Sequence, residues 1–292
     1  MSASQELSEL ARRRQNGLEP KSGAMVDDTS SLAATRLAEP RFRGQVGTPL
    51  YRAHEWFVFC ALLLVFGAAS LAWSQVAAVL FRLLPSRLGR PLGQLAVTVG
   101  FRSFVAMLRL SRIIACDLRA LDSLRDQPAV IIAPNHPSLL DAVFILSRLP
   151  QVGCAIKAEL WDNVFLGGGA RLAGFIRNDT PTTFIREAER QLRAGRHVLI
   201  FPEGTRTAGH TIGEFKSGFA FIAKRVGAPI QTVIIESNSR FLGKGWPLFR
   251  RPAFPLVYHV RLGRRLSVDC GVHGFVRDLR DYFGRELGCG SR

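Results

Sequence analysis

The chain has 292 residues, of which 47% are hydrophobic, and it carries a formal net charge of +16. This apolar content excludes a wholly disordered chain, and the length suits one sizeable domain with an appendage, or two small domains. Five scattered cysteines without a CxxC pair predict neither a disulfide framework nor a structural zinc site. The excess of arginine predicts an anionic partner such as nucleic acid, a phospholipid surface or an acidic carrier protein.

Residues 1–50 are predicted to form a disordered basic tail. Charges of both signs alternate there with Ser, Ala and Gly without a helical or strand period, and Arg12-Arg13-Arg14 lies near the start. Nothing in this segment buries enough apolar surface to offset the entropy of ordering. No apolar run follows the arginines closely, so the tail is not expected to be a signal peptide.

Residues 51–115 are predicted to attach the chain to a membrane. The stretch from Trp56 to Trp73 carries no charge, and the apolar run continues to Phe81. About twenty helical residues cross a hydrocarbon core of about 30 Å, so the pattern predicts a transmembrane helix with tryptophan at its interfaces. The alternative is a buried core helix.

An amphipathic helix is predicted to follow, over residues 92–114. Its polar face carries Gln94, Thr98, Arg102, Arg109 and Arg112, and its apolar face carries Leu95, Val99, Phe104, Val105 and Leu108. Six arginines and no acidic residue lie between Trp56 and Cys116. The pattern is typical of a helix that lies flat in an anionic headgroup layer, with a surface helix packed on the soluble domain as the alternative.

Residues 116–292 are predicted to form an α/β domain. Strands are expected at 129–133, 152–156, 198–201, 230–235 and 257–260, and helices at 139–149, 181–194, 216–226 and 275–287. Short apolar strands that alternate with helices favour a largely buried sheet.

The first motif with chemical potential runs from Asn135 to Asp141, where a strand gives way to a helix. His136 is suited to take a proton near neutral pH, and a carboxylate can hold its other ring nitrogen. Two residues that are five positions apart do not lie on one face of a continuous helix. His136 is therefore expected in the turn before the helix, bent back by Pro137. The alternative is a capping box in which Ser138 caps the helix, Asp141 lies at its positive end and His136 is a loop residue.

The second motif, Phe201–Thr207, follows another strand. Gly204 lets the backbone approach a ligand, and Arg206 offers a fork suited to phosphate. Glu203 is expected to hold that arginine or to bind a hydroxyl. The alternative is a plain turn with solvated charges.

Together these motifs resemble the glycerolipid acyltransferase family, which includes the bacterial 1-acylglycerol-3-phosphate acyltransferases. The four blocks of the family have counterparts in order, at Asn135–Asp141, Gly174–Arg177, Phe201–Thr205 and Pro229–Val233. The second block departs from the family pattern because its glycine and arginine are closer together than usual. The resemblance implies a mixed sheet flanked by helices and preceded by a membrane-embedded helical segment.

The resemblance also implies a reaction. His136, oriented by Asp141, would act as general base on the free hydroxyl of a lysophospholipid such as 1-acylglycerol-3-phosphate, which then attacks the thioester of acyl-CoA or acyl carrier protein. No cofactor or metal is needed, and amides at and near Gly204 are candidates for stabilising the oxyanion. The implied substrate-binding residues are Glu203, Gly204, Thr205 and Arg206, with Arg177, Lys157, Lys216 and Pro229 as further candidates.

Because activated acyl donors are cytosolic, the catalytic domain is expected on the cytoplasmic side of a bacterial inner membrane. No nucleic-acid motif is present, so nucleic acid is not an expected partner. The alternatives are acylation of another lyso-lipid such as lyso-ornithine lipid, a non-catalytic lipid-binding module anchored to the membrane, and a hydrolase with Ser138 or Cys154 as nucleophile.

Overall fold

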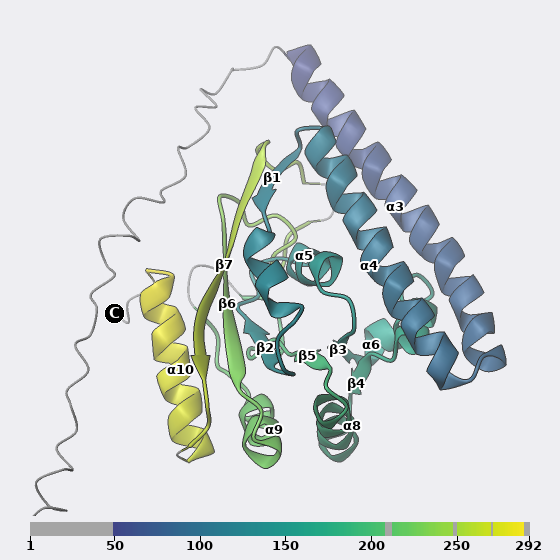
Figure 1. Cartoon of the computed structure of the whole chain (residues 1–292). Coiled ribbons are helices and arrows are strands. Elements are labelled where there is room, and N and C mark those ends of the chain that lie inside the picture. The colour runs from purple at the N-terminus through teal and green to yellow at the C-terminus, as the bar shows by residue number, and fades with distance from the viewer. Residues whose placement is uncertain (1–48, 208–211, 248–249, 270, 289–292) are drawn as a thin grey trace, which may run out of the picture. The chain divides into compact units, whose positions relative to one another are not determined.

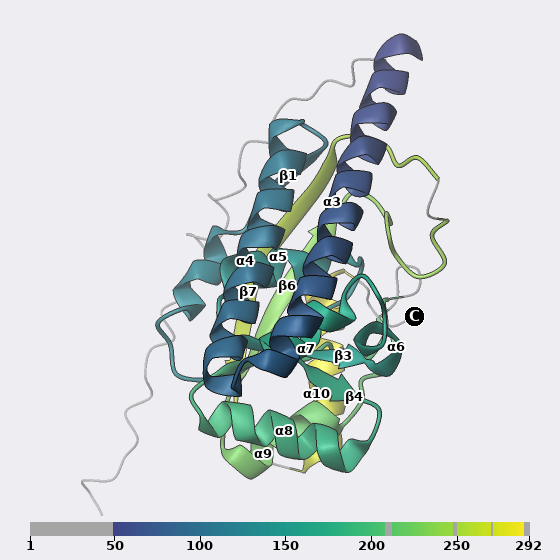
Figure 2. The same cartoon turned by 90° about the vertical axis from the view of Figure 1, so that its right-hand side faces the viewer.

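The computed structural model describes residues 49–207, 212–247, 250–269 and 271–288. The predicted tail at 1–50 therefore lies almost entirely outside the described residues. The described chain begins with two long helices, α3 (Pro49–Leu83) and α4 (Ser86–Leu110), which run side by side (Figures 1 and 2). Pro85 separates them, because a proline disfavours helical backbone at the residue before it.

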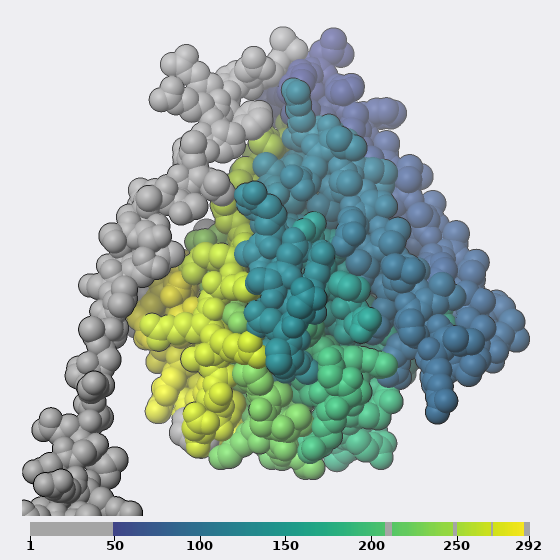
Figure 3. Space-filling model, in the orientation of Figure 1, coloured from purple at the N-terminus to yellow at the C-terminus, as the bar shows by residue number. Residues whose placement is uncertain are grey.

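By length and composition both helices could cross a membrane, whereas the sequence predicts this of the first helix alone. The outer side of α3 exposes an apolar face that includes Phe57, Leu64, Val65, Val76 and Val79. In the space-filling view the two helices form one side of the unit from Pro49 onward (Figure 3).

The faces predicted for the second helix are partly wrong. Gln94 and Thr98, predicted on the polar face, are buried, whereas Leu95 and Val99, predicted on the apolar face, are more than half exposed. The physical reason is that α4 packs its inner side on α5 and α7 and turns these leucine and valine side chains outward.

Aromatic packing and an ion pair hold α3 against the domain. Phe59 is buried, with ring centroids 5.2 Å from Phe241 and 5.3 Å from Phe254, in the loop after the sixth strand. Glu55 accepts a hydrogen bond of 2.8 Å from Arg251 of the same loop. Truncating a phenylalanine packed in this way costs about 3–5 kcal/mol, so α3 is an integral part of the domain.

The sheet has seven strands in the order β1-β7-β6-β2-β5-β3-β4. The strands are β1 (Ile114–Asp117), β2 (Ile131–Pro134), β3 (Val152–Lys157), β4 (Ile176–Asn178), β5 (His197–Leu199), β6 (Ile230–Ser237) and β7 (Leu256–Leu266). All neighbouring strands pair in parallel except β6 and β7, so the sheet is mixed, as predicted.

Helices cover both faces of the sheet (Figure 1). They are the 3-10 helix η1 (Arg119–Leu124) and α5 (Leu140–Arg148), α6 (Ala158–Trp161), α7 (Gly167–Ala173), α8 (Pro181–Arg193), α9 (Gly218–Val226) and α10 (Val272–Glu286). One core cluster includes Phe104 and Phe144 from α4 and α5, and the other includes Phe184, Phe219 and Phe283 from α8, α9 and α10. The five predicted strands and four predicted helices of the domain are confirmed, while β1, η1, β4, α6 and α7 are additions.

A buried histidine joins β5 to the chain before β2. His197 Nδ1 accepts a hydrogen bond of 3.2 Å from Val130 N–H, so Nε2 carries the hydrogen and donates to Leu124 O at 2.9 Å. Burial lowers the pKa of His197, which favours this neutral form.

Candidate active site

Both sequence motifs lie at the carboxyl ends of two adjacent parallel strands. The turn that contains His136 follows β2, and the turn that begins at Phe201 follows β5, which pairs with β2 in parallel. In open α/β sheets this edge is where ligand sites are usually built.

The predicted contact between His136 and Asp141 is confirmed. His136 Nδ1 lies 2.9 Å from Asp141 Oδ2, with His136 in the turn and Asp141 in the first turn of α5. The Asp141 side chain is fully buried, while the His136 side chain is 14% exposed. His136 Nδ1 therefore contacts a buried carboxylate, while part of the His136 side chain is open to solvent.

The capping alternative is also partly realised. Asp141 Oδ2 accepts a second hydrogen bond of 2.7 Å from Ser138 N–H, and Ser138 Oγ accepts one of 3.2 Å from Leu140 N–H. The two interpretations of this motif are compatible, because one carboxylate oxygen orders the turn and holds the imidazole.

The ionised carboxylate decides which ring nitrogen carries the hydrogen. An ionised Asp141 only accepts, so His136 Nδ1 donates and Nε2 keeps a lone pair that can take a proton. Burial raises the pKa of Asp141, while the hydrogen bonds from His136 and Ser138 N–H oppose that rise.

Sequence reasoning missed three contacts that fix this turn. The ring of Phe201 stacks on the His136 ring at 3.8 Å between centroids, and His136 O accepts a hydrogen bond of 2.8 Å from Thr207 N–H. Asn135 exchanges two hydrogen bonds of 2.8 Å with the backbone of Ile235 in β6. Asn135 and Phe201 belong to the motifs, but their spacing does not reveal these partners.

Of the two roles predicted for Glu203, the structure does not show the first, an ion pair with Arg206. Its buried carboxylate accepts hydrogen bonds of 2.6 Å from Thr207 Oγ1 and 3.0 Å from Gly213 N–H. The hydroxyl that Glu203 binds is therefore the chain's own, and this side chain links Thr207 to Gly213.

Gly204 and Thr205 are the exposed tip of the second turn. Gly204 has a φ of 63°, a backbone conformation that favours glycine. Its N–H donates to Phe201 O at 2.9 Å, so this amide closes the turn and does not serve the predicted oxyanion role.

Arg206 is oriented by the loop after β6. Its Nη1 donates to Leu242 O at 2.9 Å and to Gly243 O at 3.1 Å. These two bonds use both Nη1 hydrogens and leave the edge formed by Nε and Nη2 for an anion.

The further predicted binding residues lie at different distances from the turn. The Lys216 side chain passes beside Gly204, 3.6 Å from the position of a Cβ at that glycine. Lys157 and Arg177 belong to β3 and β4, two and three strands from β2 in the sheet order. At about 4.8 Å per strand, these are lateral offsets of about 10 and 14 Å.

Two of the predicted binding residues, Arg177 and Pro229, do not lie in a phosphate site. Arg177 is paired with Asp179 at 2.6 Å and with Asp162 at 3.5 Å. Pro229 O accepts a hydrogen bond from Ile131 N–H at the start of β2, so Pro229 lies at the end of the sheet opposite to His136. The structure does not bring Pro229 to the site.

The residues proposed for a hydrolase are poorly placed to act as nucleophiles. Ser138 is 1% exposed and its hydroxyl donates to Phe241 O at 2.9 Å. Burial raises the pKa of the Cys154 thiol to about 12, so this group stays protonated near neutral pH.

Comparisons with known proteins agree with this arrangement. A family model described as Acyltransferase matches residues 116–236. The chain is 25% identical over 189 residues to a 1-acyl-sn-glycerol-3-phosphate acyltransferase of Pseudomonas aeruginosa, covering 63% of this chain and 72% of the relative. It is 34% identical over 135 residues to the human 1-acyl-sn-glycerol-3-phosphate acyltransferase beta, covering 43% of this chain and 46% of that relative.

A lyso-ornithine lipid O-acyltransferase of Rhodobacter capsulatus is 37% identical over 90 residues, covering 30% of this chain and 32% of the relative. The chain thus spans less than half the length of the human and Rhodobacter proteins. The crystal structure of the 1-acyl-sn-glycerophosphate acyltransferase PlsC from Thermotoga maritima superposes with a TM-score of 0.58 at 16% identity, covering 83% of this chain and 98% of that chain. This likeness confirms the predicted fold class.

Proposed function

The chain belongs to the glycerolipid acyltransferase family, as an enzyme of the 1-acylglycerol-3-phosphate acyltransferase type, and from this premise we propose its reaction. It transfers a fatty acyl group from acyl-CoA or acyl carrier protein to the free hydroxyl of a lysophospholipid, with 1-acylglycerol-3-phosphate as the acceptor. The observation that carries the proposal is the 2.9 Å contact between His136 Nδ1 and the buried Asp141 carboxylate, which leaves Nε2 free as a base.

In the proposed reaction, His136 Nε2 takes the proton of the acceptor hydroxyl as its oxygen attacks the thioester carbonyl. The new C–O bond forms, the tetrahedral intermediate collapses, and the C–S bond breaks. The departing thiolate takes the proton from His136 Nε2. Since a thiolate leaves readily, the acyl group passes directly to the acceptor and no acyl-enzyme is required.

Arg206 is proposed to bind the phosphate of the acceptor. Its free edge of Nε and Nη2 matches two phosphate oxygens, and the carbonyls of Leu242 and Gly243 hold the guanidinium in one orientation. Lys216, beside Gly204, adds positive charge at the same turn.

The helices α3 and α4 are proposed to keep the enzyme on the membrane. Their exposed side chains include Leu64, Val76, Leu92 and Leu95, which favour contact with hydrocarbon. A base held near the headgroup layer meets an oriented acceptor at high local concentration. Because the activated donors are cytosolic, we place the domain on the cytoplasmic side of an inner membrane.

The test is a panel of lyso-lipids offered with labelled acyl-CoA or acyl carrier protein to membranes that contain the full chain. We expect labelled phosphatidic acid from 1-acylglycerol-3-phosphate with the wild type. His136→Ala should lose this product, whereas His273→Ala, which removes an exposed histidine on α10, should retain it. Equal product with the wild type and His136→Ala would overturn the proposal.

The same panel tests a second acceptor. The similarity to the Rhodobacter capsulatus enzyme favours lyso-ornithine lipid as the alternative, and the carboxylate of that lipid also suits the Arg206 fork. A product formed from lyso-ornithine lipid but not from 1-acylglycerol-3-phosphate would reassign the acceptor while retaining the mechanism.

A further inference from the structure

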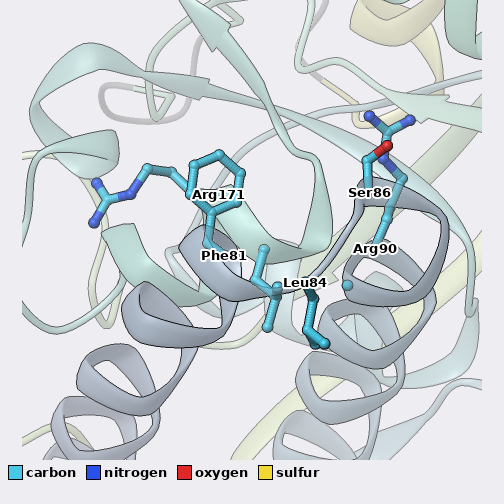
Figure 4. Close-up of a pocket in the computed structure, with 7 residues that line it drawn as sticks. Phe81, Leu84, Ser86, Arg90 and Arg171 are labelled. Carbon is cyan, nitrogen blue, oxygen red and sulfur yellow. The ribbon is translucent and has the colours of Figure 1, made fainter.

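A cavity of about 240 Å³ opens beside the turn between α3 and α4. Phe81, Leu84 and Leu172 form its apolar wall, and Ser86, Arg90 and Arg171 also line it (Figure 4). Arg171 Nη1 donates to Trp161 O at 2.7 Å, so Ser86 and Arg90 are the polar groups left for a ligand. Ser86 and Arg90 lie on one side of the cavity, and the Arg171 guanidinium points to the other side (Figure 4). We call this cavity the cationic pocket.

The cationic pocket is separate from the His136 site. Arg171 and Leu172 lie in α7, which leads into the start of β4, whereas His136 follows the end of β2. The strands β2 and β4 are three positions apart in the sheet, a lateral offset of about 14 Å, and the two places lie toward opposite ends of their strands. The reaction proposed above therefore gives the cationic pocket no role.

Arg90 lies in surroundings of excess positive charge. It is half-buried, and no carboxylate lies within ion-pair distance of it among the residues that the structure describes. Arg190 and Arg196 are close enough to repel it. Glu187 is the nearby acid that attracts Arg90, but it already forms a 2.6 Å ion pair with Arg190.

Such a cluster is stabilised by an anion. When a half-buried guanidinium has no counter-charge, nothing offsets the free-energy cost of its partial desolvation, and the neighbouring arginines add repulsion. A guanidinium presents paired donors that match phosphate oxygens, and the Ser86 hydroxyl is a further donor on the same side.

The apolar wall indicates that the anion belongs to an amphiphile. Phe81 is 49% exposed and continues into the outer face of α3, where Val76 and Val79 are also exposed. The volume lies below the roughly 300–1,000 Å³ typical of pockets for drug-sized ligands, so it suits a headgroup with the first carbons of its chains. The remaining carbons of the acyl chains then lie along the apolar face of α3, in the hydrocarbon of the membrane.

We infer that the cationic pocket binds the headgroup of an anionic membrane phospholipid, with its phosphate on Arg90 and its apolar part against Phe81, Leu84 and Leu172. The bound lipid fixes the turn between α3 and α4 at the membrane surface. The phosphates of acyl-CoA share this chemistry, and the experiment separates the two sources.

The experiment measures binding of short-chain phosphatidylglycerol, short-chain phosphatidylcholine and CoA to the full chain purified in a neutral detergent. Phosphatidylglycerol is the probe because it is anionic and is neither the acceptor nor the product of the proposed reaction. The variants are Arg90→Gln, Arg90→Lys, which keeps the charge, and Arg206→Gln, which alters the acceptor site. Arg186→Gln is the matched control, because it removes an exposed arginine from α8.

We expect phosphatidylglycerol to bind the wild type about tenfold or more tightly than phosphatidylcholine, and Arg90→Gln to lose about tenfold of that affinity. Arg90→Lys should retain part of it, and Arg186→Gln should bind as the wild type does. Loss of phosphatidylglycerol binding in Arg206→Gln but not in Arg90→Gln would place the lipid in the acceptor site and overturn the inference. Equal binding of the two lipids, or unchanged binding by both Arg90 variants, would overturn the inference. Arg90-dependent binding of CoA in place of phosphatidylglycerol would reassign the pocket to the donor. Acyl transfer is measured separately, so loss of this site and failure of the proposed reaction are distinguishable.

Discussion

Replacing Asp141 with asparagine removes the negative charge that holds His136 and keeps nearly the same shape. In the wild type, Oδ2 accepts from His136 Nδ1 and from Ser138 N–H, and the other oxygen, Oδ1, is buried without a hydrogen-bond partner. The asparagine oxygen can take the place of Oδ2, but its NH2 group then lies buried without an acceptor. With the amide turned the other way, His136 Nδ1 must accept, and Nε2 carries the hydrogen and is no longer a base.

The size of the effect follows from these two orientations. Losing a charge-assisted hydrogen bond to the imidazolium that forms in the transition state costs about 1.5–3 kcal/mol, which is about 10- to 150-fold in kcat. The reversed tautomer costs more, up to about 10⁴-fold. Because Asp141 is fully buried and does not reach the acceptor, KM for either substrate should change little.

The assay is steady-state acyl transfer with labelled donor, comparing Asp141→Asn with Asp281→Asn, which alters an exposed acid on α10. We expect a fall in kcat for Asp141→Asn alone, at unchanged membrane content of the protein. A wild-type kcat, or a change confined to KM, would refute the positioning role of Asp141.

Three further predictions concern neighbouring features. Phe201→Leu removes the ring stacked on His136, a contact worth about 0.5–1.5 kcal/mol, so kcat should fall by about 2- to 10-fold with KM unchanged in the same assay. Arg206→Gln should raise KM for a phosphate-bearing acceptor by about tenfold or more, while KM for the acyl donor stays the same. His197 binds fewer protons in the folded than in the unfolded chain below pH about 6.5, because its folded pKa is lowered, so the free energy of unfolding should fall as pH drops below that value.

A different result would contradict each of these three predictions. An unchanged kcat in Phe201→Leu would show that stacking does not order the imidazole, and a donor-specific KM effect in Arg206→Gln would remove it from the acceptor site. Denaturant unfolding across pH tests His197, with His197→Gln as the comparison. A pH dependence that is the same in His197→Gln would assign it to other groups.

The sequence predicts the five strands inside the sheet and misses the two strands at its edges. The missed strands β1 and β4 are no shorter than the predicted β2 and β5, but only the first residue of each is buried, whereas β2 and β5 are buried throughout. The edge strands therefore carry little apolar pattern. The helix α7 begins with Gly167-Gly168-Gly169, a run with low helix propensity. Tertiary contact overrides that propensity, since a side chain at Gly168 would collide with the backbone of Ser74 in α3.

The buried and exposed faces of α4 were only partly predictable from the sequence. An outward polar face and an inward apolar face are expected for a helix on a soluble domain. In the first half of α4, Gln94 and Thr98 are buried while Leu95 and Val99 are exposed. In the second half, Phe104, Val105 and Leu108 are buried while Arg102 and Arg109 are exposed. The buried side of α4 therefore joins Gln94 and Thr98 to Val105 and Leu108, which were predicted on opposite faces.

Within the site, local contacts were predictable and distant ones were not. The five-residue separation of His136 and Asp141 suffices to predict their contact, because both belong to one turn. The partners of Arg206 are backbone carbonyls of Leu242 and Gly243, and backbone groups carry no residue-type signal. The buried carboxylate of Glu203 also accepts from the backbone N–H of Gly213, ten residues later, and no local spacing in the sequence indicates that contact.

The central claim is that His136 is the base, and chemical rescue tests it most directly. His136→Ala removes the ring beside Phe201, so free imidazole added to the assay has a place to bind. We predict that acyl transfer by this variant falls by about 10²- to 10⁴-fold and is partly restored as the imidazole concentration rises, with no such gain in the wild type or in His273→Ala. Turnover at the wild-type rate in His136→Ala without added imidazole would contradict the account.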